Sequence, residues 1–490
     1  MVDLSPRTRS GFAAPQRFEA DVFDCDVIGR IPADLEGMFV RVGGDPLYPP
    51  KYEHDSSASS DGYISAFWFH DGYVDYRGRY VKTERLLANK AARRQRFGVY
   101  RNPFTDEPGV ESIDRTVANT APYAHAGKLF ALKEDSLPYE IDPVTLETIG
   151  RYDFNGQYKS LTFTAHPKTD PFSGEMVCYG YEATGLLSDD LFVYTIDRTG
   201  QITREWRLKV PYVSMMHDMA LTQKHILFPV WGYVTSMERL KAGEVHWGWD
   251  DKVPMYMGVL PRDGDARDVR WIKGPPGRAI VHTVNAWSEG DKVYLEAPMF
   301  TGAPFPDFKP IDGSPWDPAK AKAYFTRFSF DLSSKDGSWS EERLFEIPVC
   351  DLARVDDRFK TVRQRYAFTH YHDPKLPSDI EFFQGKPRAM RNCYGRFDMT
   401  TGEIDSLFAG PTHGLQECQF VPRRPDAEEG DGYLIGVANN YKELRSELII
   451  ADAKHLKDGE IARVILPFRA GAQIHCTWLS AEDFPQLRTR

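Results

Sequence analysis

The chain has 490 residues, and its 13% aromatic residues, 34 prolines and 38 glycines are typical of many short strands joined by tight turns. The net charge of −10 is spread along the sequence without a basic stripe that interleaves aromatic residues, which excludes nucleic acid as an expected partner. No apolar run approaches the ~18 residues of a spanning helix and the N-terminus has no continuous apolar export segment, so we expect a cytoplasmic protein without stable membrane insertion.

Residues 1–50 are expected to form an extended lead-in packed on the main body, with a turn at 31–37 before a strand over 38–42. A unit of strand, aspartate turn and strand then recurs, with the turn aspartates at Asp71, Asp142, Asp197, Asp263, Asp331, Asp398 and Asp452. Successive aspartates are 54 to 71 residues apart, which is compatible with four-stranded blades that carry insertions. We therefore predict an all-β fold, a seven-bladed β-propeller that forms a single domain over residues 1–490.

Four histidines occupy a common position relative to these turns. A lone histidine beside apolar residues is more often a core residue than a ligand. Here His166, His217, His282 and His475 follow the preceding turn aspartate by 24, 20, 19 and 23 residues. Because residues at one phase of different blades converge on the propeller axis, we expect the four imidazoles to meet and bind one metal ion. Four neutral ligands with open coordination positions suit Fe²⁺ and oxygen chemistry.

Two carboxylates share the same phase: Asp351 and Glu417 lie 20 and 19 residues after their turn aspartates. Metal-bound imidazoles usually donate the second ring N–H to a carboxylate or carbonyl, so we expect these two residues to orient the histidines. The alternative is that they are ordinary polar residues held by water at the axis. Four histidines that fall outside the phase are interpreted as surface or hydrogen-bonding residues: His70, His125, His370 and His372.

Motifs for other chemistry are missing from the sequence. Six cysteines without C-x-x-C spacing suit reduced thiols better than a disulfide framework or a zinc site: Cys25, Cys178, Cys350, Cys393, Cys418 and Cys476. No Gly-x-Ser-x-Gly elbow, Walker-type loop or dinucleotide fingerprint is present, so hydrolase and nucleotide-binding functions have no motif in their favour.

The sequence resembles the carotenoid cleavage oxygenases over nearly its whole length. The matching segments are residues 31–37 with Arg41, 79–83, 163–167, 216–218, His282 with 285–287, 354–356 with 365–366, 420–423 and 466–475. The resemblance implies a propeller with a loop and helix lid over the iron-bearing axis, including insertions at about 84–118. It also implies a non-haem Fe²⁺ held by the four histidines, and O2-dependent cleavage of a conjugated C=C bond into two carbonyl products.

The resemblance adds residues that the spacing does not select. It implies that Glu134 is a third carboxylate behind the ligands, and it places Asp351 where the family has Glu, so that this shorter side chain would act through a longer bond or a water. Residues 131–134 are similar to the lignostilbene dioxygenase branch, which implies that Lys133 and Tyr100 hold the 4-hydroxyl of a phenolic stilbene. An ammonium and a phenol there would stabilise a phenolate. The alternative is an ion pair of Lys133 with Glu134 or Asp135.

We therefore expect an Fe²⁺ dioxygenase that cleaves the central double bond of 4-hydroxylated stilbenes with O2 to give two aromatic aldehydes. The basic, polar segment 90–96 favours a water-soluble phenol over a carotenoid extracted from a membrane. The alternatives are carotenoid or apocarotenoid cleavage, an isomerase that uses the iron site without O2, and a binding propeller without a catalytic metal. A homodimer is compatible with the sequence.

Overall fold

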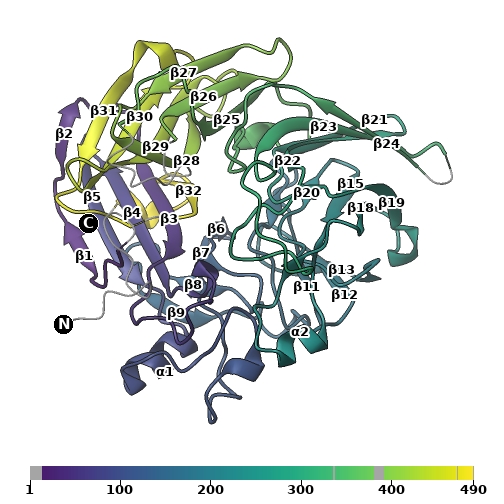
Figure 1. The fold of residues 1–490 in the computed structure, drawn as a ribbon. Helices are drawn as coiled ribbons and strands as arrows, with labels where there is room; N and C mark the ends of the chain where they lie inside the picture. Colours follow the sequence, from purple (N-terminus) through teal and green to yellow (C-terminus); the bar gives the residue numbers. More distant parts are fainter. Residues whose placement is uncertain (1–13, 335–336, 380–390, 472, 489–490) are drawn as a thin grey trace.

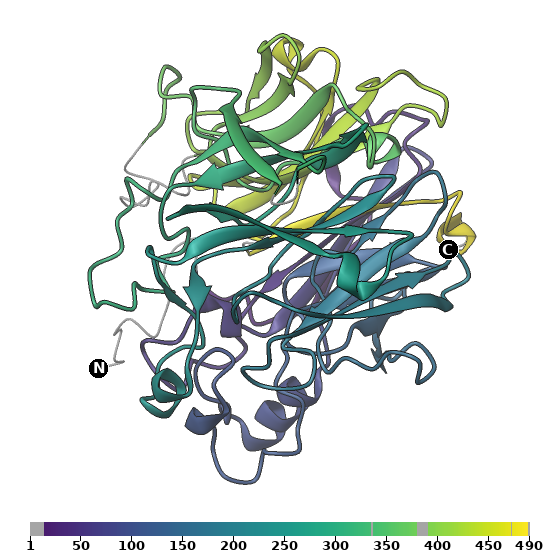
Figure 2. The same cartoon turned by 90° about the vertical axis from the view of Figure 1, so that its right-hand side faces the viewer.

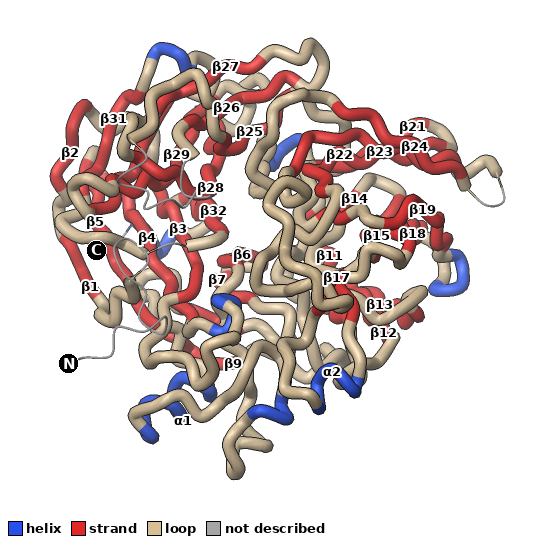
Figure 3. The backbone as a smooth tube through the Cα atoms, in the orientation of Figure 1, coloured by secondary structure: helices blue, strands red, loops and turns tan. Residues whose placement is uncertain are grey.

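The fold is a seven-bladed β-propeller, as predicted, with the blades arranged around a common axis (Figures 1 and 3). The computed structural model describes residues 14–334, 337–379, 391–471 and 473–488. From the axis outward, blade 1 comprises β32 (His475–Ser480), β3 (Gly37–Gly44), β4 (Gly62–His70), β5 (Tyr73–Tyr80) and β1 (Ala20–Val22). Blade 2 comprises β6 (Ala121–His125), β7 (Lys128–Leu132), β8 (Tyr139–Ile141) and β9 (Thr148–Arg151). Blade 3 comprises β10 (Lys168–Thr169), β11 (Met176–Tyr181), β12 (Asp190–Ile196) and β13 (Ile202–Lys209).

Blades 4 to 7 continue the ring in chain order. Blade 4 comprises β14 (Ala220–Leu221), β15 (His225–Val230), β18 (Pro254–Pro261) and β19 (Arg270–Pro276), and blade 5 comprises β20 (Ala279–Ile280) with β21 (Asn285–Glu289), β22 (Lys292–Phe300), β23 (Ala323–Asp331) and β24 (Ser338–Arg343). Blade 6 comprises β25 (Tyr366–Tyr371), β26 (Cys393–Asp398) and β27 (Ile404–Phe408). Blade 7 comprises β28 (His413–Pro422), β29 (Gly432–Asn440), β30 (Arg445–Asp452), β31 (Glu460–Ile465) and β2 (Asp26–Gly29). In blade 6, isolated bridges add the segment around Val349 to Arg354 on the axis side of β25.

The repeated aspartates lie at the same hairpin of every blade, between the third and fourth strands counted from the axis. At five of these turns the carboxylate accepts backbone N–H groups; Asp142 Oδ1 accepts from Val144 N and Thr145 N, and Asp398 Oδ1 from Thr400 N and Thr401 N, and the others are Asp197, Asp331 and Asp452. Aspartate stabilises such turns because its short side chain replaces backbone acceptors that the turn cannot supply. The predicted repeat is thus confirmed by the position of the aspartates and, at these five turns, by their hydrogen bonds.

The two ends of the chain close the ring. β3 near the N-terminus pairs with the C-terminal β32 from Gly37 opposite Ser480 to Val42 opposite His475, and β2 pairs with β31 of blade 7. Residues 14–50, expected as an extended lead-in, therefore supply one inner strand and two edge strands. The buried core between blades 1 and 7 includes Phe39.

Helices are few and lie outside the blades. α1 (Glu84–Ala92) begins after Thr83, whose hydroxyl accepts from Leu86 N as an N-cap. α2 (Met237–Lys241) lies between β16 (Tyr233–Val234) and β17 (Gly248–Trp249), which pair with each other. The perpendicular view shows α1 and α2 at the lower end of the molecule (Figure 2). Among the described residues, no helix is long and apolar enough to cross a membrane.

Replacement of Phe39 by alanine tests the closure of the ring. Phe39 is fully buried in β3 against blade 7, so its loss leaves a cavity that we expect to lower the free energy of unfolding by about 3–5 kcal/mol. Chemical denaturation followed by tryptophan fluorescence measures the change. Phe172→Ala is the control because its ring is 60% exposed, and an equal loss of stability in both variants would contradict the role of this core.

Candidate metal centre

The four predicted histidines come together at the propeller axis. His166 lies two residues before β10, His217 precedes β14, His282 lies between β20 and β21, and His475 begins β32. One ring nitrogen from each lies within 4.8 Å of the others. The histidines stand at the ends of the innermost strands, where each blade presents a short irregular segment to the axis. The four histidines that share one position in the sequence repeat therefore form one site, as predicted.

Three of the imidazoles are oriented by carboxylates from other blades. The Nδ1 atom of His217 is hydrogen-bonded to Glu134, that of His282 lies 2.9 Å from Asp351 Oδ2, and that of His475 lies 3.0 Å from Glu417 Oε1. The contact of Asp351 with His282 is direct, so the longer or water-mediated bond expected for this shorter side chain is not needed. With these contacts every blade contributes one residue to the centre.

The carboxylates are ionised despite their burial. Burial alone would raise the pKa of Glu417, but the guanidinium of Arg354 and the ring of His475 outweigh it and lower this pKa to about 2. Burial is outweighed in the same way at Asp351, where the hydrogen bond to His282 lowers the pKa below its ordinary value. An ionised carboxylate accepts only, so Nδ1 of each bonded imidazole is the donor. The lone pair on Nε2 is therefore left for another partner.

These Nε2 atoms fit a divalent metal ion. The Nε2 atom of His217 lies 3.0 Å from Nε2 of His166 and 3.1 Å from Nε2 of His282. Nε2 of His475 is buried and has no hydrogen-bond partner among the described residues. Burial and the neighbouring histidines hold the pKa of His166 well below its usual range, which favours the neutral ring. Lone pairs that face one another in a buried space repel, and a cation between them removes the repulsion.

Lys133 and Tyr100 lie together, as the family resemblance implied. Nζ of Lys133 is 5.0 Å from the centroid of the Tyr100 ring, and it donates to Asn119 Oδ1 at 2.9 Å and to Ala58 O at 3.2 Å. Within the described chain Lys133 makes no ion pair, because Glu134 bonds His217 and Asp135 accepts from the Thr116 hydroxyl. The ion pair considered as the alternative is therefore not formed, and burial lowers the pKa of Lys133.

Tyr100 is fixed by contacts with distant parts of the chain. Its ring stacks on Phe308 with centroids 5.5 Å apart, its N–H donates to Asp55 Oδ1 at 2.8 Å, and its carbonyl accepts from His246 N at 3.1 Å. The next residue, Arg101, donates to the buried carboxylate of Glu182 at 2.5 Å. The sequence did not predict three of these neighbours, Asn119, Phe308 and Glu182, because they lie in different blades and share no repeated spacing.

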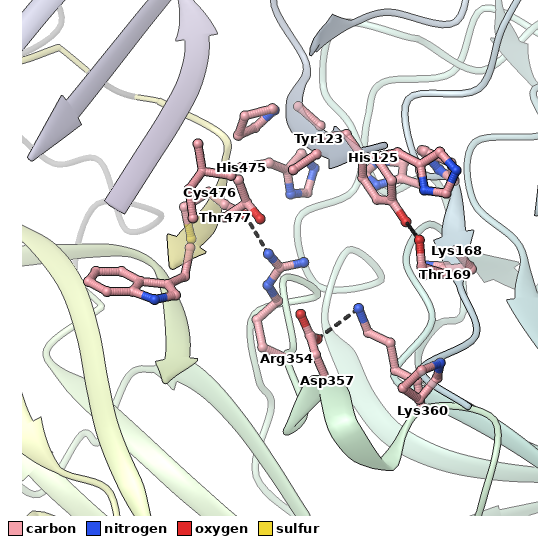
Figure 4. Close-up of a pocket in the computed structure, with 18 of the residues that line it drawn as sticks. Tyr123, His125, Lys168, Thr169, Arg354, Asp357, Lys360, His475, Cys476 and Thr477 are labelled. Atoms are coloured by element: carbon pink, nitrogen blue, oxygen red, sulfur yellow. Dashed lines mark hydrogen bonds and ion pairs between the residues drawn. The ribbon is translucent and has the colours of Figure 1, made fainter. Parts of the chain in front are cut away.

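One cavity reaches two of the histidines of the centre. A cavity of about 560 Å³ is lined by His166 and His475 but by neither Tyr100 nor Lys133. In the view of Figure 4, Lys168 and Thr169 lie across this cavity from Cys476. Two of its cations are paired with acids: Lys168 with Asp218 at 2.8 Å, and Lys360 with Asp357 at 2.7 Å. Arg198 instead donates to the carbonyl of Ser173, so the cavity is polar and carries charges of both signs.

The histidines outside the phase do not join the cluster. His70 lies 3.3 Å from Asp75, and His125 Nε2 lies 2.7 Å from the carbonyl of Asp197. His370 is only 2% exposed, so the surface position considered for it is wrong, and burial lowers its pKa to about 3. All six cysteines are free thiols and buried.

Comparison with known proteins gives the family. The profile described as retinal pigment epithelial membrane protein matches residues 13–480. The chain is 40% identical over 479 residues to lignostilbene-α,β-dioxygenase isozyme III of Sphingomonas paucimobilis, with 97% of each chain covered. It is 42% identical over 471 residues to isoeugenol monooxygenase of Pseudomonas putida, with 96% of this chain and 97% of the relative covered. The crystal structure of Pseudomonas brassicacearum lignostilbene dioxygenase superposes with a TM-score of 0.92 at 39% identity, covering 96% of this chain and 98% of that one.

The chain belongs to the carotenoid cleavage oxygenase family. It is an enzyme with a four-histidine metal site, and its reaction is oxidative cleavage of a C=C bond. A binding propeller without a catalytic metal is thereby set aside.

Removal of a supporting carboxylate tests how the centre is held. In Glu417→Ala, the ring of His475 loses its hydrogen-bond acceptor. The backbone N–H of Cys476, which lies 2.6 Å from Glu417 Oε2, also loses its hydrogen bond to this carboxylate. We expect a 10–100-fold weaker affinity for the metal, measured by competition with a chelator. Glu447→Gln is the control, since Glu447 is equally buried but bonds Arg445 in blade 7. An affinity unchanged in Glu417→Ala would contradict this role.

Proposed function

We propose that this protein is an Fe²⁺-dependent dioxygenase that cleaves the central double bond of 4-hydroxylated stilbenes with O2 to give two aromatic aldehydes. The observation that carries the substrate class is the buried ammonium of Lys133 beside Tyr100. In the part of the chain that the structure describes, no carboxylate is in contact with this ammonium. The family supplies the reaction type, and the relatives named for lignostilbene and isoeugenol support a phenolic substrate.

The proposal for iron follows from the ligands. His166, His217, His282 and His475 would hold the ion through Nε2, with Glu134, Asp351 and Glu417 fixing three of the rings. Four neutral nitrogen ligands leave the charge of a 2+ ion uncompensated and leave coordination positions open. When bound, the iron would supply the activation of O2, and the reaction balances as one alkene and one O2 giving two aldehydes.

Lys133 would bind the phenol and increase its reactivity. An ammonium has three donors, and two are used by Asn119 and Ala58, so one N–H is left for a ligand. Glu134 and Asp135 act on this buried ammonium without contacting it, and a phenolate would supply a negative charge in direct contact. The negative charge of a phenolate delocalises through the ring onto a conjugated double bond. Binding by Lys133 and Tyr100 would therefore also make the alkene more electron-rich.

We propose isoeugenol as a second candidate substrate of the same site. Isoeugenol and hydroxylated stilbenes share a phenol conjugated with an alkene, and Lys133 with Tyr100 would bind only that shared part. The residues that receive the other end of the substrate would decide between them. A carotenoid hydrocarbon is less favoured, because it offers no group to the buried ammonium. We also propose that residues 84–118, which carry Tyr100, act as the lid of a single catalytic domain.

Replacement of Lys133 by methionine tests the role of the ammonium. We expect turnover of a 4-hydroxystilbene to fall by at least about 100-fold, since the electrostatic contribution to phenolate stabilisation is lost, while iron content is unchanged. Product aldehydes measured by chromatography and bound iron measured by elemental analysis give the two readouts. The control substrate is the 4-methoxy analogue, whose slow cleavage we expect to be equal in both proteins. Equal cleavage of the 4-hydroxystilbene by both proteins would overturn the proposal.

A further inference from the structure

One of the four histidines lacks the support that the others have. His217, His282 and His475 are each bonded through Nδ1 to a carboxylate, whereas His166 has no carboxylate partner among the described residues. Its own backbone N–H donates to the hydroxyl of Thr164 at 2.9 Å, which fixes the chain before the ring. A histidine whose ring is not oriented binds a metal ion more weakly. Other contacts must therefore fix the backbone next to His166 in place of a carboxylate.

Asp218 connects the segments of three ligands. It follows His217 directly, and its Oδ1 atom lies 2.8 Å from Nζ of Lys168, two residues after His166. Its Oδ2 atom accepts from the backbone N–H of Thr283 at 2.7 Å, one residue after His282, and lies 2.9 Å from the Thr283 hydroxyl. One side chain thus joins blades 3, 4 and 5 next to their ligands.

The network requires a carboxylate at this position. Oδ1 of Asp218 also accepts from Met219 N at 2.7 Å, so donors approach both oxygen atoms. An asparagine has one oxygen and one NH2 group, and in either orientation the NH2 group would face a donor. The side chain of Asp218 is 2% exposed and that of Lys168 is 21% exposed. Loss of either partner would leave the other charge largely buried without compensation, which is strongly unfavourable.

We propose that the Lys168–Asp218 pair positions His166 for metal binding, in place of the carboxylate that supports each of the other three ligands. Asp218 holds the His166 segment in register with His217 and His282, while Glu417 holds His475 independently from blade 7. Lys168 and Asp218 are positioning residues that act through the ligand segments. The inference rests on the proposed metal-binding role of the four histidines.

Titration of the metal-free protein with Co²⁺ tests the proposal, because the visible absorption of Co²⁺ reports both affinity and coordination. We expect Lys168→Met and Asp218→Asn to weaken binding by 10–100-fold and to change the absorption spectrum as His166 is lost. Lys168→Arg keeps the charge and is expected to stay within about threefold of the unmodified protein. Thermal unfolding without metal, measured in parallel, gives the purely structural cost of each substitution.

Two reference variants separate the possible outcomes. Glu447→Gln removes an equally buried carboxylate far from the axis and is expected to lower thermal stability without changing Co²⁺ affinity or spectrum. If Lys168→Met behaves like Glu447→Gln, the positioning role is overturned, and this holds even where Asp218→Asn fails to fold. If His217→Ala binds Co²⁺ as tightly as the unmodified protein, the metal site itself is wrong, and the proposed function fails separately.

Discussion

The hydrogen bond between an imidazole Nδ1 atom and a carboxylate from another blade is the interaction on which this centre depends. It fixes the tautomer, because an ionised carboxylate accepts and leaves Nε2 as a bare lone pair. Glu134, Asp351 and Glu417 impose this state on three rings and direct the lone pairs toward one point. Neighbouring acceptors in a buried space are stable together only around a cation.

Such bonds require the ring of blades to close correctly. Glu417 lies in blade 7 and His475 in β32, which joins blade 1 by pairing with β3. A shift of this pairing by one residue would turn His475 to the opposite face of the strand and break its bond with Glu417. The stability of the fold and the geometry of the metal centre are therefore linked through the same strand register.

Periodicity predicted the fold and the shared position of the four histidines, because the turn aspartates recur at one hairpin and the axis gathers residues of equal phase. Asp351 and Glu417 followed from the same spacing. Glu134 did not, since it follows β7 in blade 2 and lies outside the phase, and it came from the family resemblance together with Lys133 and Tyr100. Asn119 and Asp218 act through contacts between blades, which a single sequence does not encode as a pattern.

The surroundings of Lys133 and the axial cavity differ in chemistry. Tyr100, Phe308 and Lys133 combine aromatic surface with one buried ammonium, and the proposed recognition of a phenol rests on this combination. The axial cavity reaches His166 and His475, and two of its cations, Lys168 and Lys360, are paired with acids (Figure 4). The proposed recognition of the substrate by Lys133 and Tyr100 is therefore separate from the residues that line this cavity.

The most direct test is oxygen uptake by protein loaded with Fe²⁺ under anaerobic conditions and then given a 4-hydroxystilbene and air. The account predicts one O2 consumed and two aromatic aldehydes formed for each stilbene, with a much slower reaction for a polyene of similar length. Faster cleavage of the polyene, or conversion of the stilbene without oxygen consumption, would contradict it.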